Sequence, residues 1–206
     1  MVASTVTNLM VYHGSNRIIA IEDIKFPGPR ENCDFGSGFY VTDNKHTAEE
    51  WIINEPDPVV NAYHLDIDSS KVLFLEGSDW IRAIVGFRKK IYKVTFKSNI
   101  ISGPIANDRM VPAINLFMEG IIGDLRLLRC LDYCKLGNQY VFRSSAEGLT
   151  PYKSYGLANL QLQQAATRWV GRRRRMNDDL KIIQRTPISG ELYIDDYLHK
   201  GDFLEV

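Results

Sequence analysis

The sequence predicts an α+β fold in a globular chain. Of its 206 residues, 45% are hydrophobic and 24% are charged, which is typical of a chain that buries a substantial core. Apolar and β-branched runs predict strands at residues 9–13, 59–67 and 72–75. Apolar residues at helical spacing predict helices over residues 79–89 and 123–134. The predicted strands and helices therefore lie interspersed along the same part of the chain.

Composition limits the partners, the cellular location and the metal sites that we expect for the protein. The formal net charge is zero, so nothing global points to nucleic acid or to a membrane as partner. The N-terminus lacks the features of a secretory signal, and no run approaches the roughly 20 apolar residues of a membrane span, so we expect a cytoplasmic protein. Cys130 and Cys134, at i and i+4, fit the buried face of a helix better than a disulfide. No four-ligand spacing of Cys and His occurs, so we predict no metal site.

The first strand ends at His13 and Gly14, and a surface loop over residues 17–34 follows it. Pro27, Gly28 and Pro29, together with mixed charges, predict that this loop crosses a cleft. The charged side chains of the loop, Arg30 and Asp34, either meet the phosphates of a ligand or face solvent, and we expect them to face solvent.

Residues 35–52 predict a loop, a strand and a helix in that order. Gly36 and Gly38 let the backbone turn sharply or approach another segment closely. The Phe-Tyr-Val-Thr run after them has strand character, and Asp43 or Asn44 is suited to cap the helix that bears Trp51. Tyr40 and Trp51 can then flank one cleft. The alternative is a strand-turn-helix unit whose aromatic side chains form part of the core.

Further strands are predicted at residues 92–96 and 100–105, and residues 136–142 predict a turn followed by a strand. Asn107 and Asp108 are good caps and predict the start of a helix near residue 106. The alternative is that one of these two side chains lies at the cleft.

Beyond residue 150, Pro151–Tyr155 resembles a linker, and residues 157–184 predict a long helix interrupted at Gly171. The helix contains four consecutive arginines, which either grip the phosphates of a nucleic acid or an acidic partner, or form a solvated face answered by Asp178 and Asp179. Residues 191–206 are acidic and aromatic, and either return as a final strand or dock against the basic helix. The arginines are Arg172, Arg173, Arg174 and Arg175.

Three motifs resemble the signature of the ADP-ribosyltransferase superfamily, in the branch shared by diphtheria toxin and the poly(ADP-ribose) polymerases. They are His13-Gly14-Ser15 at a strand end, the Phe-Gly-Ser-Gly-Phe-Tyr segment of residues 35–40, and Asn-Gln-Tyr at residues 138–140. The chain also resembles the bacterial DUF3990 family, which shares the Gly-Pro-Ile-Ala-Asn-Asp segment of residues 103–108. The resemblance covers roughly residues 9–148.

The resemblance implies a split, strongly bent mixed sheet, that is, two small facing sheets with peripheral helices and a dinucleotide in the crevice. It implies that residues 8–148 form the catalytic domain. Residues 149–206 would then be a helical basic tail with an acidic-aromatic C-terminal segment.

The resemblance also implies NAD as co-substrate. His13 would hydrogen-bond the adenosine ribose, the backbone of Gly14 would hold the nicotinamide carboxamide, and Ser15 would assist. Tyr40 and Trp51 would stack on the nicotinamide ring, an arrangement that their π-faces favour. The implied cofactor-binding residues are His13, Gly14, Ser15, Gly38, Tyr40, Trp51, Asn107 and Asp108, and the implied catalytic residues are Gln139, His13 and Tyr40.

The chain departs from the superfamily pattern at Gln139, which stands where the polymerases have their key glutamate. A carboxylate there stabilises an oxocarbenium-like transition state, whereas glutamine offers only a carbonyl oxygen to the ribose hydroxyl. Three alternatives stay open. Gln139 suffices; or Asp108, Glu119 or Glu147 supplies the carboxylate; or the fold binds the dinucleotide without turning it over.

The expected function is mono-ADP-ribosyl transfer from NAD to a protein or nucleic-acid acceptor, as in a bacterial toxin or effector, with Arg172–Arg175 engaging the acceptor. The alternatives are an NAD glycohydrolase and a non-catalytic module that binds NAD or ADP-ribose. No Gly-x-Gly-x-x-Gly lies between a strand and a helix, which disfavours a hydride-transfer dehydrogenase.

Overall fold

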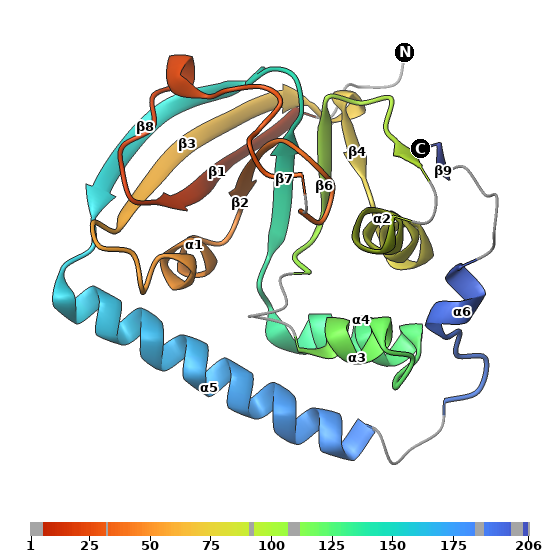
Figure 1. The fold of residues 1–206 in the computed structure, drawn as a ribbon. Coiled ribbons are helices and arrows are strands. Elements are labelled where there is room, and N and C mark those ends of the chain that lie inside the picture. Colours follow the sequence, from red (N-terminus) through yellow and green to blue (C-terminus); the bar gives the residue numbers. More distant parts are fainter. Residues whose placement is uncertain are drawn as a thin grey trace.

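Figure 1 shows the computed structural model, which describes residues 6–31, 33–90, 93–106, 112–183, 188–198 and 204–205. The predicted α+β class is confirmed. Seven strands form one mixed sheet in the order β4-β6-β7-β2-β1-β3-β8, and the sheet does not close. Its strands are β1 (Val6–Ser15), β2 (Phe39–Thr42), β3 (Val59–Asp68), β4 (Val72–Phe74), β6 (Ile100–Pro104), β7 (Asn138–Phe142) and β8 (Leu149–Gly156).

The sheet is narrow at its centre. Strands β1, β3 and β8 pair antiparallel along most of their lengths, and β2, β7, β6 and β4 make up the other half. The two halves meet at a single described pair, Tyr12 opposite Thr42. The four-residue β2 is too short to follow the ten-residue β1. These seven strands thus form one continuous sheet with a narrow junction. That its two halves face each other as two small sheets stays a prediction.

The helices are α1 (Lys45–Trp51), α2 (Gly77–Lys89), α3 (Ala113–Met118), α4 (Asp124–Cys134), α5 (Asn159–Ile183) and α6 (Ile194–Tyr197). Asn44 caps α1, as predicted, because its side chain accepts a hydrogen bond from the backbone N–H of His46 at 3.0 Å. Asn107 and Asp108 lie outside the described residues, and the helix expected near residue 106 is described only from Ala113.

Two predictions for the C-terminal part were wrong. Residues 151–155 are not a linker but part of β8, the edge strand that pairs with β3. Pro151 is tolerated there because an edge strand has one unpaired side. Helix α5 runs through Gly171 without a break, since Ala165 and Met176 anchor it in the core on both sides of that residue.

The acidic-aromatic segment folds back onto the molecule. Its last described residues form β9 (Leu204–Glu205), parallel to β5 (Val94–Thr95), so a final strand is confirmed. Before it, Glu191 forms a buried ion pair with Arg126 at 3.0 Å, and the Tyr197 hydroxyl donates to Asp124 at 2.7 Å. The described part of the segment therefore docks on α4.

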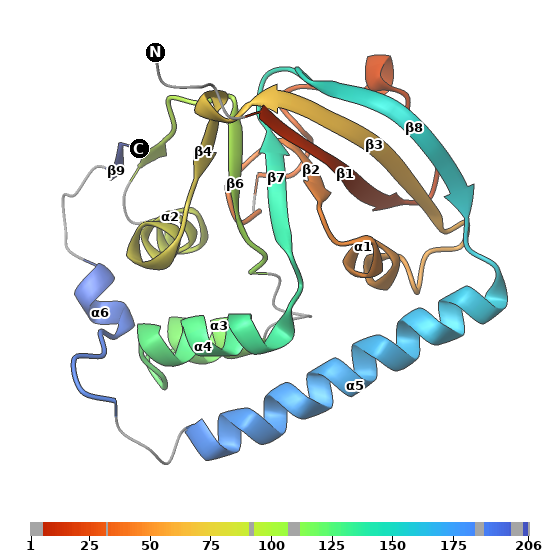
Figure 2. The ribbon, with the colours of Figure 1, turned by 180° about the vertical axis from the view of Figure 1, so that it is seen from behind.

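Helices cover one face of the sheet. In both views, α5 passes beneath α1 and beneath the α3–α4 pair (Figures 1 and 2). The largest core lies among these helices and includes Trp80, Phe117 and Val141. On the other face, apolar side chains of the loop before β2, including Ile21 and Phe26, pack over a second core. This loop therefore covers the strands that carry the candidate site.

Candidate functional site

The three predicted motifs lie on neighbouring strands. His13 is on β1, Tyr40 on β2 and Gln139 on β7, and these strands are consecutive in the sheet. Thr42 of β2 is opposite both Tyr12 of β1 and Gln139 of β7. Segments separated by more than a hundred residues of chain thus meet at the narrow junction of the sheet.

His13 bridges this junction. Its Nδ1 lies 2.6 Å from the carbonyl oxygen of Tyr40, and its ring centroid is 4.7 Å from that of Phe39. A carbonyl only accepts, so Nδ1 carries the proton and Nε2 of the neutral ring is an acceptor. Burial lowers the pKa of His13, and the nearby Arg30 adds to this, while the hydrogen bond to Tyr40 opposes it. His13 is therefore a neutral imidazole that offers a lone pair.

Gly14 and Ser15 stabilise the local structure at the end of β1. A Cβ on Gly14 would lie 2.5 Å from the carbonyl oxygen of Ala48, so only glycine lets α1 pack here. The Ser15 hydroxyl donates to the carbonyl of Arg17 at 2.5 Å and accepts from Asn61 Nδ2 at 3.0 Å. It is thus engaged in holding the start of the loop.

Tyr40 holds the loop that precedes its own strand. Its hydroxyl donates to the Gly36 carbonyl at 2.6 Å and accepts from the Phe35 N–H at 3.1 Å. Burial raises the pKa of Tyr40, which stays neutral. A Cβ on Gly38 would lie 2.7 Å from the Phe142 carbonyl oxygen, so glycine permits the close approach of this segment to β7.

Trp51 is the last residue of α1 and is half-buried. Its ring packs against the same core as the half-buried Tyr40, and its Nε1 has no hydrogen-bond partner among the described residues. Both rings thus border the largest core. Stacking of nicotinamide between them stays a prediction.

Gln139 is 2% exposed and is held by its amide nitrogen. Nε2 donates to Asp34 Oδ2 at 2.9 Å and to the Pro104 carbonyl at 3.0 Å. Both amide hydrogens are thereby used, and no described residue donates to Oε1. The side chain is fixed with its carbonyl oxygen as the remaining polar function.

Asp34 is the residue that sequence reasoning missed, since we expected it to face solvent. It is 9% exposed, accepts from the Ala106 N–H at 3.0 Å, and pairs with Arg88 Nη2 at 2.9 Å. Arg88 also donates to the Ala106 carbonyl. The available signal was Gln139 itself, because a polar side chain inside an apolar strand requires a buried partner.

The alternative carboxylates are located elsewhere or are not described. Glu147 pairs with Lys71, and Glu119 is an exposed residue at the end of α3. Asp108 lies outside the described residues. Among the described carboxylates, Asp34 is the one that contacts Gln139.

The arginines of α5 fall into two groups. Arg172 pairs with Glu50 at 2.7 Å, and Arg168 pairs with Glu49 at 2.5 Å, which ties α5 to the helix that carries Trp51. The two carboxylate side chains are 0% and 8% exposed, respectively. In contrast, Arg173, Arg174 and Arg175 are exposed. Arg172 is therefore structural, and the other three remain available to a partner.

Within the described ranges, no group of three His, Cys, Asp or Glu side chains is arranged to hold a metal ion. No helix in the part of the chain that the structure describes has the length and apolar character needed to cross a membrane.

The pKa of His13 gives a pH-dependent stability. Because the folded-state pKa lies below the ordinary value of 6.5, the unfolded chain takes up the proton first, and stability falls as the pH drops below about 6.5. His13→Asn keeps a donor for the Tyr40 carbonyl but does not titrate. We expect the melting temperature of this variant to depend less on pH below about 6.5 than that of the wild type. The control His64→Asn, at an exposed strand position, should show the same pH dependence as the wild type. Equal slopes in all three proteins would contradict a lowered pKa of His13.

Comparison with known proteins gives a family but no characterised relative. Neither a curated protein nor a solved structure matches the chain. A family model described as a protein of unknown function (DUF3990) matches residues 9–148, which is more than half of the chain. The chain therefore belongs to the DUF3990 family.

Proposed function

We propose that the protein is an NAD-dependent mono-ADP-ribosyltransferase built on the split-sheet fold of that superfamily. The observation that carries the proposal is the adjacency of β1, β2 and β7, the strands that bear His13, Tyr40 and Gln139, at the narrow junction of the sheet. The junction itself supports the split-sheet assignment, because the two halves share a single described pair.

The side chains are suited to the parts of NAD. The lone pair of His13 Nε2 accepts a hydrogen bond from a ribose hydroxyl, and the rings of Tyr40 and Trp51 are suited to a flat heteroaromatic cation. Gln139 Oε1, oriented by the two bonds of Nε2, accepts from the second ribose. NAD supplies a leaving group that already carries positive charge, so cleavage needs no general acid.

The electrostatic contribution of this site is weak. Gln139 adds no charge, and the Asp34 carboxylate beside it is paired with Arg88. We therefore expect slow turnover compared with a site that has a glutamate at this strand position, by roughly a hundredfold.

Moving the carboxylate from position 34 to position 139, and the amide from position 139 to position 34, tests this arrangement. Gln139→Glu alone sets a second carboxylate against Asp34 and removes the donor to Pro104, so we expect it to destabilise the fold. Asp34→Asn with Gln139→Glu restores a donor opposite the carboxylate. We expect this double variant to fold and to release nicotinamide up to about a hundredfold faster than the wild type. A folded double variant without any increase would show that the strand register has been assigned wrongly.

The function is tested directly with adenine-labelled NAD. The purified protein is incubated with the label and a cell lysate, and protein, nucleic-acid and small-molecule fractions are separated. Label in a macromolecular fraction, lost in His13→Ala and kept in His64→Ala, supports transfer. Free ADP-ribose and nicotinamide alone would mean a glycohydrolase. An intact cofactor that still raises the melting temperature would mean a binding module.

A further inference from the structure

Helix α5 keeps an excess of positive charge on its exposed surface after its ion pairs with α1 are counted. The helix sequence contains six basic and two acidic residues, a net charge of +4. Arg168 and Arg172 are neutralised by Glu49 and Glu50 of α1. The three arginines that follow Arg172 are exposed, and successive helical positions point them in different directions around the helix.

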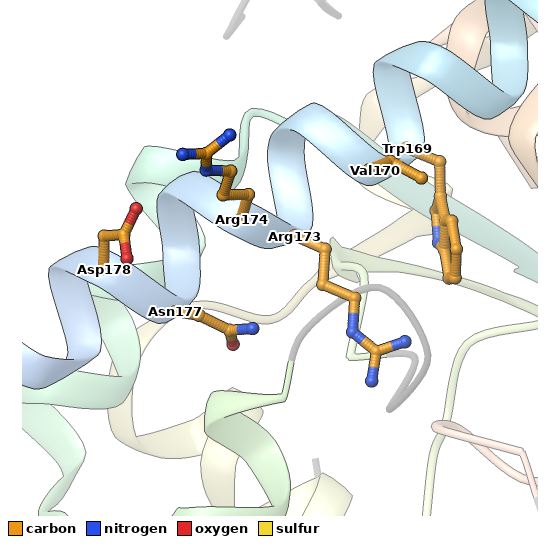
Figure 3. Close-up of a pocket in the computed structure, with 6 residues that line it drawn as sticks. All are labelled: Trp169, Val170, Arg173, Arg174, Asn177 and Asp178. Atoms are coloured by element: carbon orange, nitrogen blue, oxygen red, sulfur yellow. The ribbon is translucent and has the colours of Figure 1, made fainter.

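Two hollows flank these arginines, and each has an aromatic side chain in its wall. One hollow, of about 340 Å³, is lined by Trp169, Arg173, Asn177 and the neighbouring row of Val170, Arg174 and Asp178. Figure 3 shows Trp169, Arg173 and Asn177 pointing to the same side of α5, at intervals of four residues. The guanidinium of Arg173 lies 5.5 Å from the centroid of the Trp169 ring.

The second hollow, of about 250 Å³, lies where α5 meets α4. Its wall includes Arg175 and Tyr133, and Tyr133 is 64% exposed although its ring is large and apolar. Asp178 borders both hollows and reduces the positive charge without cancelling it. An aromatic ring beside an arginine thus occurs on both flanks of the same helix. The Tyr133 ring is exposed, and the Trp169 ring is half-buried.

We propose that this face of α5 binds single-stranded nucleic acid. The strand would cross the helix from one hollow to the other, so that Arg173, Arg174 and Arg175 contact phosphates at different points around the helix. Bases would stack at Tyr133 and on the Arg173–Trp169 pair. Guanidinium groups satisfy phosphates through several N–H donors, and aromatic rings stack on every base, so positive charge interleaved with aromatic rings suits an unpaired strand. An acidic peptide would use the charge but leave both aromatic hollows without a function. The inference does not depend on the proposed NAD chemistry.

The test measures binding without NAD. Short fluorescently labelled single-stranded RNA and DNA oligonucleotides are titrated with the full chain at several salt concentrations, and anisotropy is recorded. We expect the wild type to bind, with a logarithmic salt slope steeper by about 2 than that of the Arg173→Ala/Arg174→Ala/Arg175→Ala variant, since each phosphate contact on a single strand contributes about 0.7. Tyr133→Ala should weaken binding about tenfold.

Matched variants separate this surface from general charge. Lys25→Ala/Lys89→Ala/Lys153→Ala removes the same charge from exposed positions elsewhere, and Tyr152→Ala removes an aromatic ring that is 63% exposed on β8. Both controls should bind like the wild type. The proposal is overturned if the wild type binds neither oligonucleotide, if the charge control weakens binding as much as the arginine variant, or if polyglutamate displaces the oligonucleotide at equal charge. Because NAD is absent, these outcomes leave the proposed transferase activity to its own experiment.

Discussion

Arg172→Ala is expected to destabilise the protein by about 3 kcal/mol, because it leaves the buried Glu50 carboxylate without its closest cation. The side chain of Glu50 is 0% exposed, and its other cation, Arg168, is more distant, with Nε at 3.8 Å. Chemical denaturation at neutral pH measures the loss. Arg174→Ala is the matched control on the same helix and should change stability by no more than about 0.5 kcal/mol.

The pH dependence identifies the cause of this loss. Burial raises the pKa of Glu50 above 4.5, and Arg172 and Arg168 oppose the shift. Without Arg172 the folded-state pKa rises further, so the folded variant takes up a proton that the unfolded chain does not. The stability difference from the wild type should therefore shrink as the pH falls from about 7 toward about 5. Adding Glu50→Gln should restore part of the loss at neutral pH, whereas a loss that stays constant with pH and is not restored would indicate missing packing instead.

The pairing of Arg172 with Glu50 could not be predicted from the sequence, in which residues 149–206 were taken as a separate tail. Four adjacent arginines have the same appearance in the sequence, but only Arg172 lies on the side of the helix that faces Glu50. The buried carboxylates precede Trp51 by one and two residues and gave no sign of a partner more than a hundred residues away. Local pattern predicts a helix well, whereas the partner of a charged face depends on tertiary packing.

The strands around the candidate site were predicted better than the connections. Short apolar and β-branched runs predict all three strands next to the site. The run of β1 ends in His13, that of β2 comes directly after Gly38, and that of β7 contains Gln139. β8 was mistaken for a linker because its solvent-facing residues and Pro151 resemble a loop, and edge strands tolerate both. The narrow junction between β1 and β2 depends on the lengths of two strands far apart in the chain, which no local pattern encodes.

Asp34→Ala is expected to have the second large effect, a loss of about 3 kcal/mol of stability, because it removes the shared acceptor of two buried donors and of the partly buried Arg88. Arg88 keeps a hydrogen bond to the Ala106 carbonyl but loses its counter-charge, and Gln139 Nε2 keeps only the Pro104 carbonyl. Asp23→Ala, at an exposed position in the same loop, should leave stability within about 0.5 kcal/mol of the wild type.

A double-mutant cycle shows whether Asp34 acts through Gln139. If Asp34 positions Gln139, the effects of Asp34→Ala and Gln139→Leu on stability should be non-additive by about 1 kcal/mol, since both changes break the same hydrogen bond. Under the proposed transferase function, NAD cleavage should fall in Asp34→Ala even at a temperature where the variant is fully folded, because the Pro104 carbonyl alone then orients the Gln139 amide. Additive stability effects together with normal cleavage in folded Asp34→Ala would mean that this carboxylate only anchors the loop to Arg88.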